Sequence, residues 1–254
     1  MCQKNNSVAR FSNRVENYIK YRPHYPKEII KILEDKIGLK KEDIIADIGS
    51  GTGFSCINFL ENGNTVIGVE PNTEMREASL KILENYKNFS VINGLSENTT
   101  LQEKSIDIIV AGQAFHWFDY KKAKIEFQKI LKNDSYVVLI WNEKLMDKKN
   151  TFMYDYGQIL LKYGTDYEKV TYSNVSEEII SEFYTSYKVE DIPNFQYFDF
   201  ESLKGRLLSS SYTPLEGKEH DEMLIKLKES FDKYQIEGKI FFEYETKIYY
   251  GKIN

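Results

Sequence analysis

The sequence predicts an α/β fold built on a doubly wound, mostly parallel sheet. Apolar strand patterns alternate with helical patterns from residue 44 to residue 141, which is the element order of parallel β–α–β units. A loop with three glycines, residues 49–53, follows the first of these strands directly. The final segment, residues 239–252, alternates apolar and polar side chains as a half-exposed antiparallel strand does.

The first part of the chain, residues 1–38, is predicted to form a helical cap. Apolar side chains recur at helical spacing over residues 15–19. Pro23 and Pro26 end this helix, and Pro26 can begin the next one, which is expected over residues 27–37.

Residues 39–141 are expected to form the core of the sheet. Each predicted strand is short, apolar and rich in β-branched residues. The five strands are predicted at residues 44–48, 65–69, 89–92, 105–111 and 136–141. Helices are predicted between them, starting at residue 54, running from Asn72 to about Tyr86, and covering residues 119–131.

The pattern changes after the fifth predicted strand. We interpret residues 142–193 as a helical insertion that covers the strand ends, with helices at 152–163 and 176–187. Residues 194–254 are expected to complete the sheet, so that the chain forms one domain. The elements predicted there are a strand at 195–200, a helix through Leu203 and Leu208, a helix at 217–234 and the closing strand at 239–252.

Composition narrows the classes of function. The net charge of −5 argues against a nucleic-acid surface, which usually needs a basic face. Cys2 and Cys56 give neither a disulfide framework nor the spacing of metal ligands. The beginning of the sequence lacks the apolar centre of a signal peptide, and no apolar run approaches the length of a membrane span. We therefore expect a cytoplasmic monomer or homodimer without metal, nucleic acid or membrane partner.

The glycine loop and two acids form the most informative motif. Glycine lets the backbone turn sharply and approach a ligand closely, and the helix that follows directs its free N–H groups at the loop. Glu70 ends the second predicted strand, where its carboxylate can accept two hydrogen bonds from a ribose diol. Asp47 precedes the loop and suits a ligand that carries an ammonium group. Phe54 stands where dinucleotide-binding loops have glycine. S-adenosylmethionine, an amino acid attached to a nucleoside, fits both acids.

The run D-I-G-S-G-T-G, followed by an acid at the end of the next strand, resembles the class I S-adenosylmethionine-dependent methyltransferases. The resemblance implies a Rossmann-like sheet of seven strands with an antiparallel last strand, S-adenosyl-L-methionine as cofactor and S-adenosyl-L-homocysteine as product. The loop residues that it implies as cofactor contacts, with the acid behind them, are Asp47, Gly49, Ser50, Gly51, Thr52, Gly53 and Glu70. A tight turn that binds no ligand is the alternative.

Further cofactor contacts follow from the same resemblance. The run Pro71, Asn72 and Met75 matches the family habit of packing an apolar side chain against the adenine ring, although Met75 also suits a core. Leu95 stands where the family often has aspartate, so the contact to the adenine amine would fall to Ser96 and Glu97.

The segment before the first strand, Y…RP.YP, resembles one methyltransferase subgroup in which it folds over the cofactor. Tyr21 and Arg22 are the expected contacts, and packing of the tyrosines between helices and sheet is the alternative.

The acceptor side is predicted from the end of the fourth strand, where α/β sheets place their chemistry. The run A-F-H-W-F-D resembles the subgroup of trans-aconitate methyltransferase-like, type 11 enzymes that act on small molecules. Gln113 and Phe115 would contact the cofactor, His116 would act as base or orient the acceptor, and Trp117 would contact the acceptor. Packing of the insertion against the sheet is the alternative for His116.

The chemistry favours methyl transfer to oxygen. An activated methyl group needs a base only when the acceptor is a hydroxyl or a protonated amine, and a carboxylate needs none. If the acceptor is a carboxylate, Arg22 and Arg206 are the cations expected near it. A DNA amine methyltransferase would carry N/D-P-P-Y/F where this chain has GQAF. A protein that binds the cofactor and acts through a partner, without turnover, remains the second hypothesis.

Overall fold

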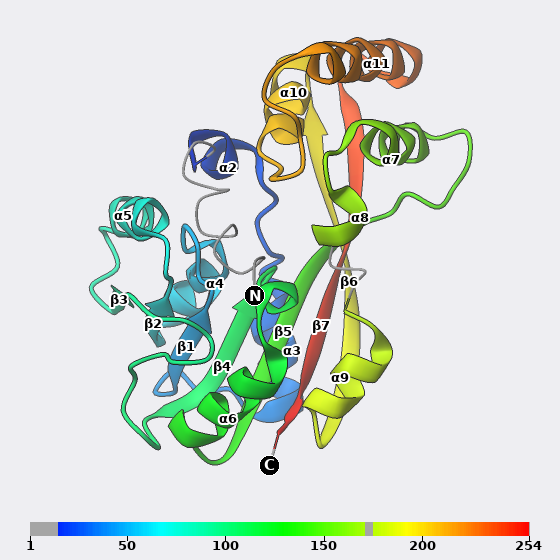
Figure 1. Cartoon of the computed structure of the whole chain (residues 1–254). Coiled ribbons are helices and arrows are strands. Elements are labelled where there is room, and N and C mark those ends of the chain that lie inside the picture. Colours follow the sequence, from blue (N-terminus) through cyan, green and yellow to red (C-terminus); the bar gives the residue numbers. More distant parts are fainter. Residues whose placement is uncertain (1–14, 171–174, 254) are drawn as a thin grey trace.

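A seven-stranded sheet forms the centre of the structure, a computed structural model that describes residues 15–170 and 175–253 (Figure 1). The buried strands are apolar on both faces, as the sequence indicates for parallel strands covered by helices. The strands are β1 (Ile44–Ile48), β2 (Thr65–Val69), β3 (Phe89–Ile92), β4 (Ile106–Gly112), β5 (Leu131–Lys144), β6 (Ser186–Phe198) and β7 (Ile240–Lys252).

The strand order is β3-β2-β1-β4-β5-β7-β6, and β7 runs antiparallel to both of its neighbours. The predicted α/β class, the doubly wound sheet and the antiparallel last strand are therefore confirmed. The register pairs Ile48 with Val69, so that Gly49 and Glu70 emerge side by side at the carboxyl end of the sheet. This is the edge at which open α/β sheets bind ligands.

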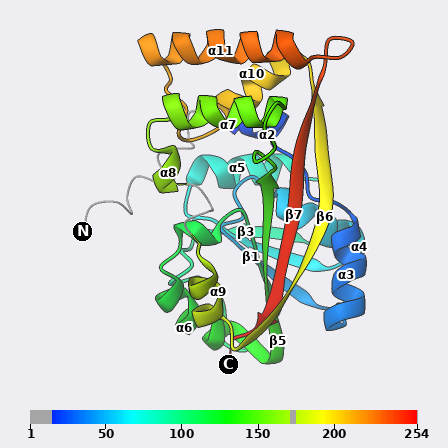
Figure 2. The same ribbon diagram turned by 90° about the vertical axis from the view of Figure 1, so that its right-hand side faces the viewer.

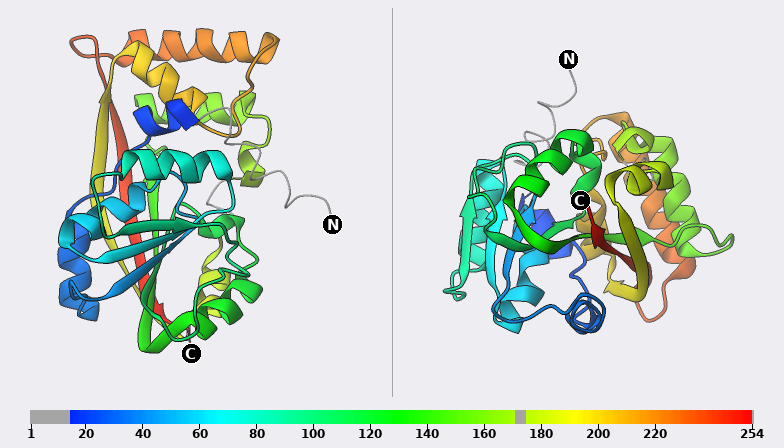
Figure 3. Two further views of the ribbon diagram at one scale, coloured as in Figure 1. Left: turned by 90° about the vertical axis from the view of Figure 1, so that its left-hand side faces the viewer. Right: turned by 90° about the horizontal axis from the view of Figure 1, so that it is seen from below.

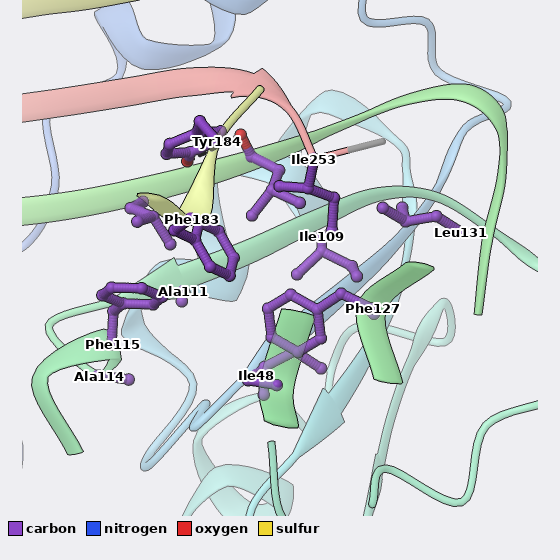
Figure 4. Packing of buried hydrophobic residues seen from close by; sticks show 14 of the residues in the cluster. Ile48, Ile109, Ala111, Ala114, Phe115, Phe127, Leu131, Phe183, Tyr184 and Ile253 are labelled. Carbon is purple, nitrogen blue, oxygen red and sulfur yellow. Dashed lines mark hydrogen bonds between the residues drawn. The ribbon is translucent and has the colours of Figure 1, made fainter. Parts of the chain in front are cut away.

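Helices cover both faces of the sheet (Figure 2). Their bounds are α2 (Val15–Tyr21), α3 (Glu28–Ile37), α4 (Phe54–Asn62), α5 (Thr73–Ile82), α6 (Tyr120–Ile130), α7 (Phe152–Tyr163), α8 (Tyr167–Val170), α9 (Glu177–Phe183), α10 (Phe200–Leu208) and α11 (Lys218–Tyr234), with a 3₁₀ turn, η1, at Phe115–Trp117. Helices α3 and α4 lie on one face, and α6 and α9 lie on the other. The aromatic rings of Phe115, Phe127 and Phe183 fill the second face (Figure 4).

Strands β6 and β7 extend past the rest of the sheet and carry a group of helices beyond its carboxyl edge (Figure 3). Helices α7, α10 and α11 pack there around Phe242 and Tyr244 of β7, in a hydrophobic core separate from the two sheet faces. We call this part, built on residues 145–170 and 196–244, the upper lobe. Helix α2 lies against α10, so the amino-terminal segment connects the upper lobe with the sheet.

Three predicted elements differ from the structure. The strand predicted at 195–200 is β6 and occupies 186–198, and the helix predicted at 176–187 is α9, which ends at Phe183. The start of β6 was placed too late in the sequence. This edge strand exposes most of its side chains, and it contains Pro193, which an edge strand tolerates. Strand β5 is longer than the predicted 136–141. Residues 1–14 of the predicted helical cap lie outside the described residues.

The described residues contain no helix with both the length and the apolar character required to cross a membrane. The division of the chain into cap, core, insertion and closing segments stays a prediction.

Candidate functional site

A pocket opens at the carboxyl ends of β1, β2 and β4. Its walls come from the glycine loop after β1, the segment that follows Glu70, the loop after β3, and residues 112–118 after β4. The cavity volume is about 270 Å³, just below the ~300–1,000 Å³ that is typical of small-molecule sites.

The glycine loop forms one wall because it carries no side chain at the closest points. Gly49 has a φ of +71°, and a Cβ added there would lie 2.7 Å from the Cβ of Ala114. Ser50, Gly51 and Thr52 also line the pocket. Gly53 does not line it. It precedes α4 with a φ of +86° and lies close to Leu83, so its role is to begin the helix and let α5 approach.

Glu70 lies on the pocket wall, where β2 ends. It is only 8% exposed, and its carboxylate accepts hydrogen bonds from the backbone N–H groups of Gly51 and Asn72, both at 2.9 Å. Burial raises the pKa of Glu70, and the two N–H donors oppose that shift. The carboxylate is thereby fixed in orientation, and each oxygen keeps a further lone pair that can accept a hydroxyl.

Asp47 lies behind the pocket wall rather than on it. It is 1% exposed, and its Oδ2 accepts hydrogen bonds from Ser55 Oγ at 2.5 Å and from Cys56 Sγ at 3.1 Å. Its Oδ1 is buried and has no hydrogen-bond donor among the described residues. Burial raises the pKa of Asp47 to about 6, against the two hydrogen bonds that lower it. An orphaned carboxylate oxygen in this place fits a cationic ligand group, directly or through water.

Asp47→Asn is expected to stabilise the unliganded protein above pH 6. The raised pKa means that the folded state of the wild type prefers the protonated acid. The wild type keeps its full stability below pH 4, the pKa of this acid in the unfolded chain, and loses part of it as the pH rises through about 6, the pKa in the folded protein. The loss amounts to roughly 3 kcal/mol for a shift of about two units. Urea unfolding of wild type and variant between pH 4 and pH 8 measures it. A difference in unfolding free energy that does not grow with pH would contradict this account of Asp47.

The residues expected around the adenine ring meet on one side of the pocket. Pro71, Asn72 and Met75 line it, and Asn72 caps α5 by accepting the N–H of Met75 at 2.8 Å. Ser96 and Glu97 line it from the loop after β3, with Ser96 Oγ donating to Glu97 at 2.9 Å. Leu95, which stands where the family often has aspartate, lies on the pocket wall with its side chain about half exposed.

The segment after β4 reaches the pocket only in part. Gln113 and Trp117 line it, and Gln113 has a φ of +54° while its Nε2 donates to the carbonyl of Asn142 at 3.0 Å. Phe115, expected to contact the cofactor, does not reach it. Its ring is buried in the core against Phe183, 4.7 Å between ring centroids (Figure 4), so its position does not support the expected cofactor contact.

His116 lies in the same turn, half-buried, with its ring 5.1 Å from that of Trp117. Its Nδ1 is buried and has no hydrogen-bond partner among residues 15–170 and 175–253. Burial, together with the nearby charge of Arg22, lowers the pKa of His116 to about 4. The imidazole is therefore neutral at pH 7, with a free lone pair or N–H to offer.

The three remaining predicted contacts lie toward the upper lobe rather than on the pocket wall. The ring of Tyr21 lies against Gly205 of α10, and Arg22 Nη2 donates to the carbonyl of Ser209 at 3.1 Å. Arg206 is buried inside the upper lobe. None of them belongs to the cofactor pocket as the structure describes it, so the cofactor role expected of Tyr21 and Arg22 is not supported by their position.

Eight residues of the pocket wall were not among the predicted contacts: Tyr25, Phe54, Ser55, Gly94, Leu95, Gly112, Ala114 and Phe118. Tyr25 comes from the same tyrosine- and proline-rich segment as Tyr21, and the sequence signal named the segment without showing which tyrosine turns inward. Phe54 and Ser55 begin α4 directly after the glycine loop, so their closeness to a ligand was foreseeable from the motif. No group of three or more histidine, cysteine or acidic side chains suited to a metal occurs in the part of the chain that the structure describes.

The sheet order, the glycine loop and the acid at the end of β2 together define the class I methyltransferase fold. Residues 46–139 match the family described as "Methyltransferase domain". Residues 46–139 are therefore similar to methyltransferase domains of the type 11 group, and the sheet order agrees with the class I methyltransferase fold.

Several known proteins that are similar to this chain are named as methyltransferases. An uncharacterised methyltransferase of Mycobacterium tuberculosis is 27% identical over 163 residues, which are 64% of this chain and 63% of the relative. A putative type II methyltransferase of Anaeromyxobacter dehalogenans superposes with a TM-score of 0.67 at 16% identity, covering 92% of this chain and 98% of that one. A phosphoethanolamine N-methyltransferase of Haemonchus contortus, solved with S-adenosylhomocysteine, gives 0.57 at 12% identity, covering 99% and 59%. The chain thus spans less than two thirds of the curated relative, and the solved structures share its fold.

Proposed function

We propose that the protein transfers the methyl group of S-adenosylmethionine to an oxygen atom of a small-molecule acceptor. The observation that carries this proposal is the fixed carboxylate of Glu70, which faces a nucleoside-sized pocket beside a glycine loop too tight for side chains. A turn that served structure alone would need no such pocket and no buried acid on its wall. A cytoplasmic location and a monomeric or dimeric state stay predictions.

The residues present fit the cofactor in three places. Glu70 would bind the ribose hydroxyls, and the orphaned Oδ1 of Asp47 would meet the positive charge of the amino group. Met75, with Pro71, would pack against the adenine ring while Ser96 and Glu97 receive its amine. The methionine end would then lie toward Gln113 and Trp117, the part of the pocket nearest the upper lobe.

The cofactor supplies an activated methyl group, so the protein has to position the acceptor in line and exclude water. The aromatic side chains of Tyr25, Trp117 and Phe118 line the pocket where the acceptor would meet the methyl group. An oxygen nucleophile attacks the methyl carbon, the carbon–sulfur bond breaks, and its electron pair stays on sulfur. A carboxylate acceptor completes this step without losing a proton.

The weak basicity of the site favours oxygen acceptors that are already ionised. The ring of His116 lies 5.1 Å from that of Trp117, and its lowered pKa makes the imidazole a poor proton acceptor. With a hydroxyl acceptor its Nδ1 would have to take the proton, and with a carboxylate the neutral ring can donate a hydrogen bond instead. Both roles use the unpartnered nitrogen, and the second suits the pKa better.

His116→Asn is expected to lower turnover at least about tenfold while the affinity for S-adenosylhomocysteine changes less than about twofold. The asparagine keeps a polar group in place but cannot exchange a proton. Turnover is measured as S-adenosylhomocysteine release from S-adenosylmethionine with a small-molecule extract as the acceptor source, and affinity by calorimetry. His220→Asn, on the far side of the upper lobe with its ring bonded to the carbonyl of Pro214, serves as control. An unaltered turnover rate in His116→Asn would mean that His116 serves packing and takes no part in methyl transfer.

The same assay separates an enzyme from a protein that only binds the cofactor. Binding without any release of S-adenosylhomocysteine, across extracts of several growth conditions, would support the binding protein.

A further inference from the structure

Three aromatic side chains form an exposed patch on β6 and β7, in the part of these strands that extends toward the upper lobe (Figure 2). Phe195, Tyr197 and Phe241 are 54%, 62% and 44% exposed. Their ring centroids lie between 5.3 and 5.7 Å apart, so the three rings contact one another. A contiguous apolar patch with polar surroundings is typical of a surface that binds another molecule.

The pairing of the strands shows which face of the sheet carries the patch. Tyr197 is opposite Phe241, and Phe195 is opposite Glu243. Opposite residues of antiparallel strands share one face, and so do alternate residues along each strand. Tyr249 of β7 lies on this face too, packed against the core that α9 covers. Between Tyr249 and the patch, the side chains of the face are exposed or only partly buried, so helix α9 covers one end of the face alone.

Acidic side chains lie on the same face, next to the aromatic patch. Glu143 of β5 is directly opposite Glu245 of β7, and like charges in opposite positions destabilise a sheet. Lys247 lies 3.1 Å from Glu143 and 3.9 Å from Glu245. Asp191 is opposite Lys247, and Glu243 follows beside the patch, so one lysine faces more acids than it can neutralise. We name this set the acidic aromatic face; its residues are Glu143, Asp191, Phe195, Tyr197, Phe241, Glu243 and Glu245.

The negative charge of this face is not fully compensated within the described residues. Burial, with the charges of Glu245 and Asp191, raises the pKa of Glu143 in spite of its ion pair with Lys247. A carboxylate whose charged form is disfavoured in this way gains from a further cation nearby. The geometry of opposed acids and the shifted pKa therefore agree that the face suits a positively charged partner.

The backbone of β6 is open on one side, because β6 is the edge strand of the sheet. The N–H of Leu145 donates to the carbonyl of Glu243 at 3.3 Å, so the backbone of this β7 residue points toward β5. Successive residues of a strand direct their backbone groups to opposite sides, so Tyr244 bonds toward β6 and to the even-numbered residue opposite it. This leaves the N–H and C=O groups of Phe195 and Tyr197 directed to the open edge, where an extended segment can pair.

We propose that the acidic aromatic face binds an extended segment of a partner protein that carries arginine and apolar side chains. Arginine pairs with carboxylates and stacks on aromatic rings, so this residue type suits both parts of the face. From Asp191 to Tyr197 the face measures about 20 Å, which about six extended residues can cover. A second copy of the chain would bring the same acids against these acids, so charge disfavours it as the occupant. The face lies outside the cofactor pocket, so this inference is independent of the proposed methyl transfer.

A synthetic peptide of arginine and leucine, about eight residues long and blocked at both ends, is the probe. Its binding to the full chain is measured by the fluorescence anisotropy of a label on the peptide. Wild type is expected to bind it at least about tenfold more tightly than a peptide with lysine in place of each arginine, because lysine keeps the charge without the planar group that stacks and forms paired hydrogen bonds. Tyr197→Ser should weaken binding at least about tenfold, and so should Glu243→Gln combined with Glu245→Gln.

Matched controls and a stability measurement separate binding from folding. Ile125→Ser removes an exposed apolar side chain of α6, and Glu222→Gln removes an acid of α11 that pairs with Lys218, so both should bind the peptide as wild type does. Urea unfolding of Glu245→Gln supplies a second test. Removing one of two opposed charges should leave the free energy of unfolding unchanged or raise it, whereas an acid that serves the fold would lower it when lost.

The contrary outcomes are equally definite. No binding of the arginine peptide, or the same affinity in Tyr197→Ser as in wild type, would overturn the proposal. Equal affinity for the lysine peptide would reduce the effect to a general attraction of cations and overturn the assignment to arginine. A wild-type dimer in sedimentation that dissociates in Tyr197→Ser would show that a second copy covers the face, and would overturn the assignment to a different protein. None of these results bears on S-adenosylhomocysteine binding, which tests the proposed function separately.

Discussion

Glu70→Gln is expected to weaken the binding of S-adenosylhomocysteine by about a hundredfold or more. The carboxylate is held by the N–H groups of Gly51 and Asn72 and would accept both ribose hydroxyls. A glutamine has one acceptor oxygen, so its amide would face either a backbone N–H or a ribose O–H, and one buried donor would lose its partner. Hydrogen bonds to a charged group contribute about 1.5–3 kcal/mol each, and two are affected.

Calorimetry measures the affinity, and thermal unfolding shows that the variant is folded. Glu61→Gln is the matched control, because this glutamate lies on the outer side of α4 and pairs only with exposed Lys27. It should bind as wild type does. A Glu70→Gln variant that keeps wild-type affinity would remove Glu70 from the site and leave the pocket without its ribose ligand.

Gly49→Ala is expected to destabilise the fold by about 2–4 kcal/mol and to abolish cofactor binding. Two effects add. A φ of +71° strains any residue with a Cβ, and the new methyl group would lie 2.7 Å from the Cβ of Ala114, which is attached to the backbone and cannot rotate away. The loop would have to move away from the segment after β4, and the pocket lies between those two segments.

The variant Gly38→Ala separates the effect of backbone strain from the effect of the steric clash. Gly38 ends α3 with a φ of +72°, almost the same as Gly49, and a Cβ there would have no neighbour within 4 Å. Urea unfolding should show a loss of about 1–2 kcal/mol for Gly38→Ala and a clearly larger loss for Gly49→Ala. Equal losses of unfolding free energy in the two variants would mean that the loop after β1 can move away from Ala114 at little cost, which would contradict the close contact between them.

The fold could be predicted wherever burial imposes a simple pattern. Strands β1, β2 and β4 are apolar on both faces, and the residues of the helices between them repeat at helical spacing, so the sheet core followed from the sequence. Strand β6 could not be predicted in the same way, because at the edge of the sheet its exposed residues include charged side chains such as Lys188 and Asp191. Its first half is held by pairing with β7, a long-range partner that no local pattern reveals.

The candidate site was predictable to the same degree. Asp47, Glu70 and the glycines are adjacent to strand ends, and topology alone brings such positions together. Phe115, His116 and Trp117 form one short turn, of which only Trp117 lines the pocket, and the packing of Phe115 against Phe183 of α9 is a long-range contact that the local sequence does not reveal.

The crystal structure of the protein with S-adenosylhomocysteine tests the central claim most directly. The account predicts the nucleoside in the pocket at the ends of β1, β2 and β4, both ribose hydroxyls within hydrogen-bond distance of the Glu70 carboxylate, and the amino group on the Asp47 side of the glycine loop. A ligand bound elsewhere, or one in this pocket whose ribose does not touch Glu70, would contradict it.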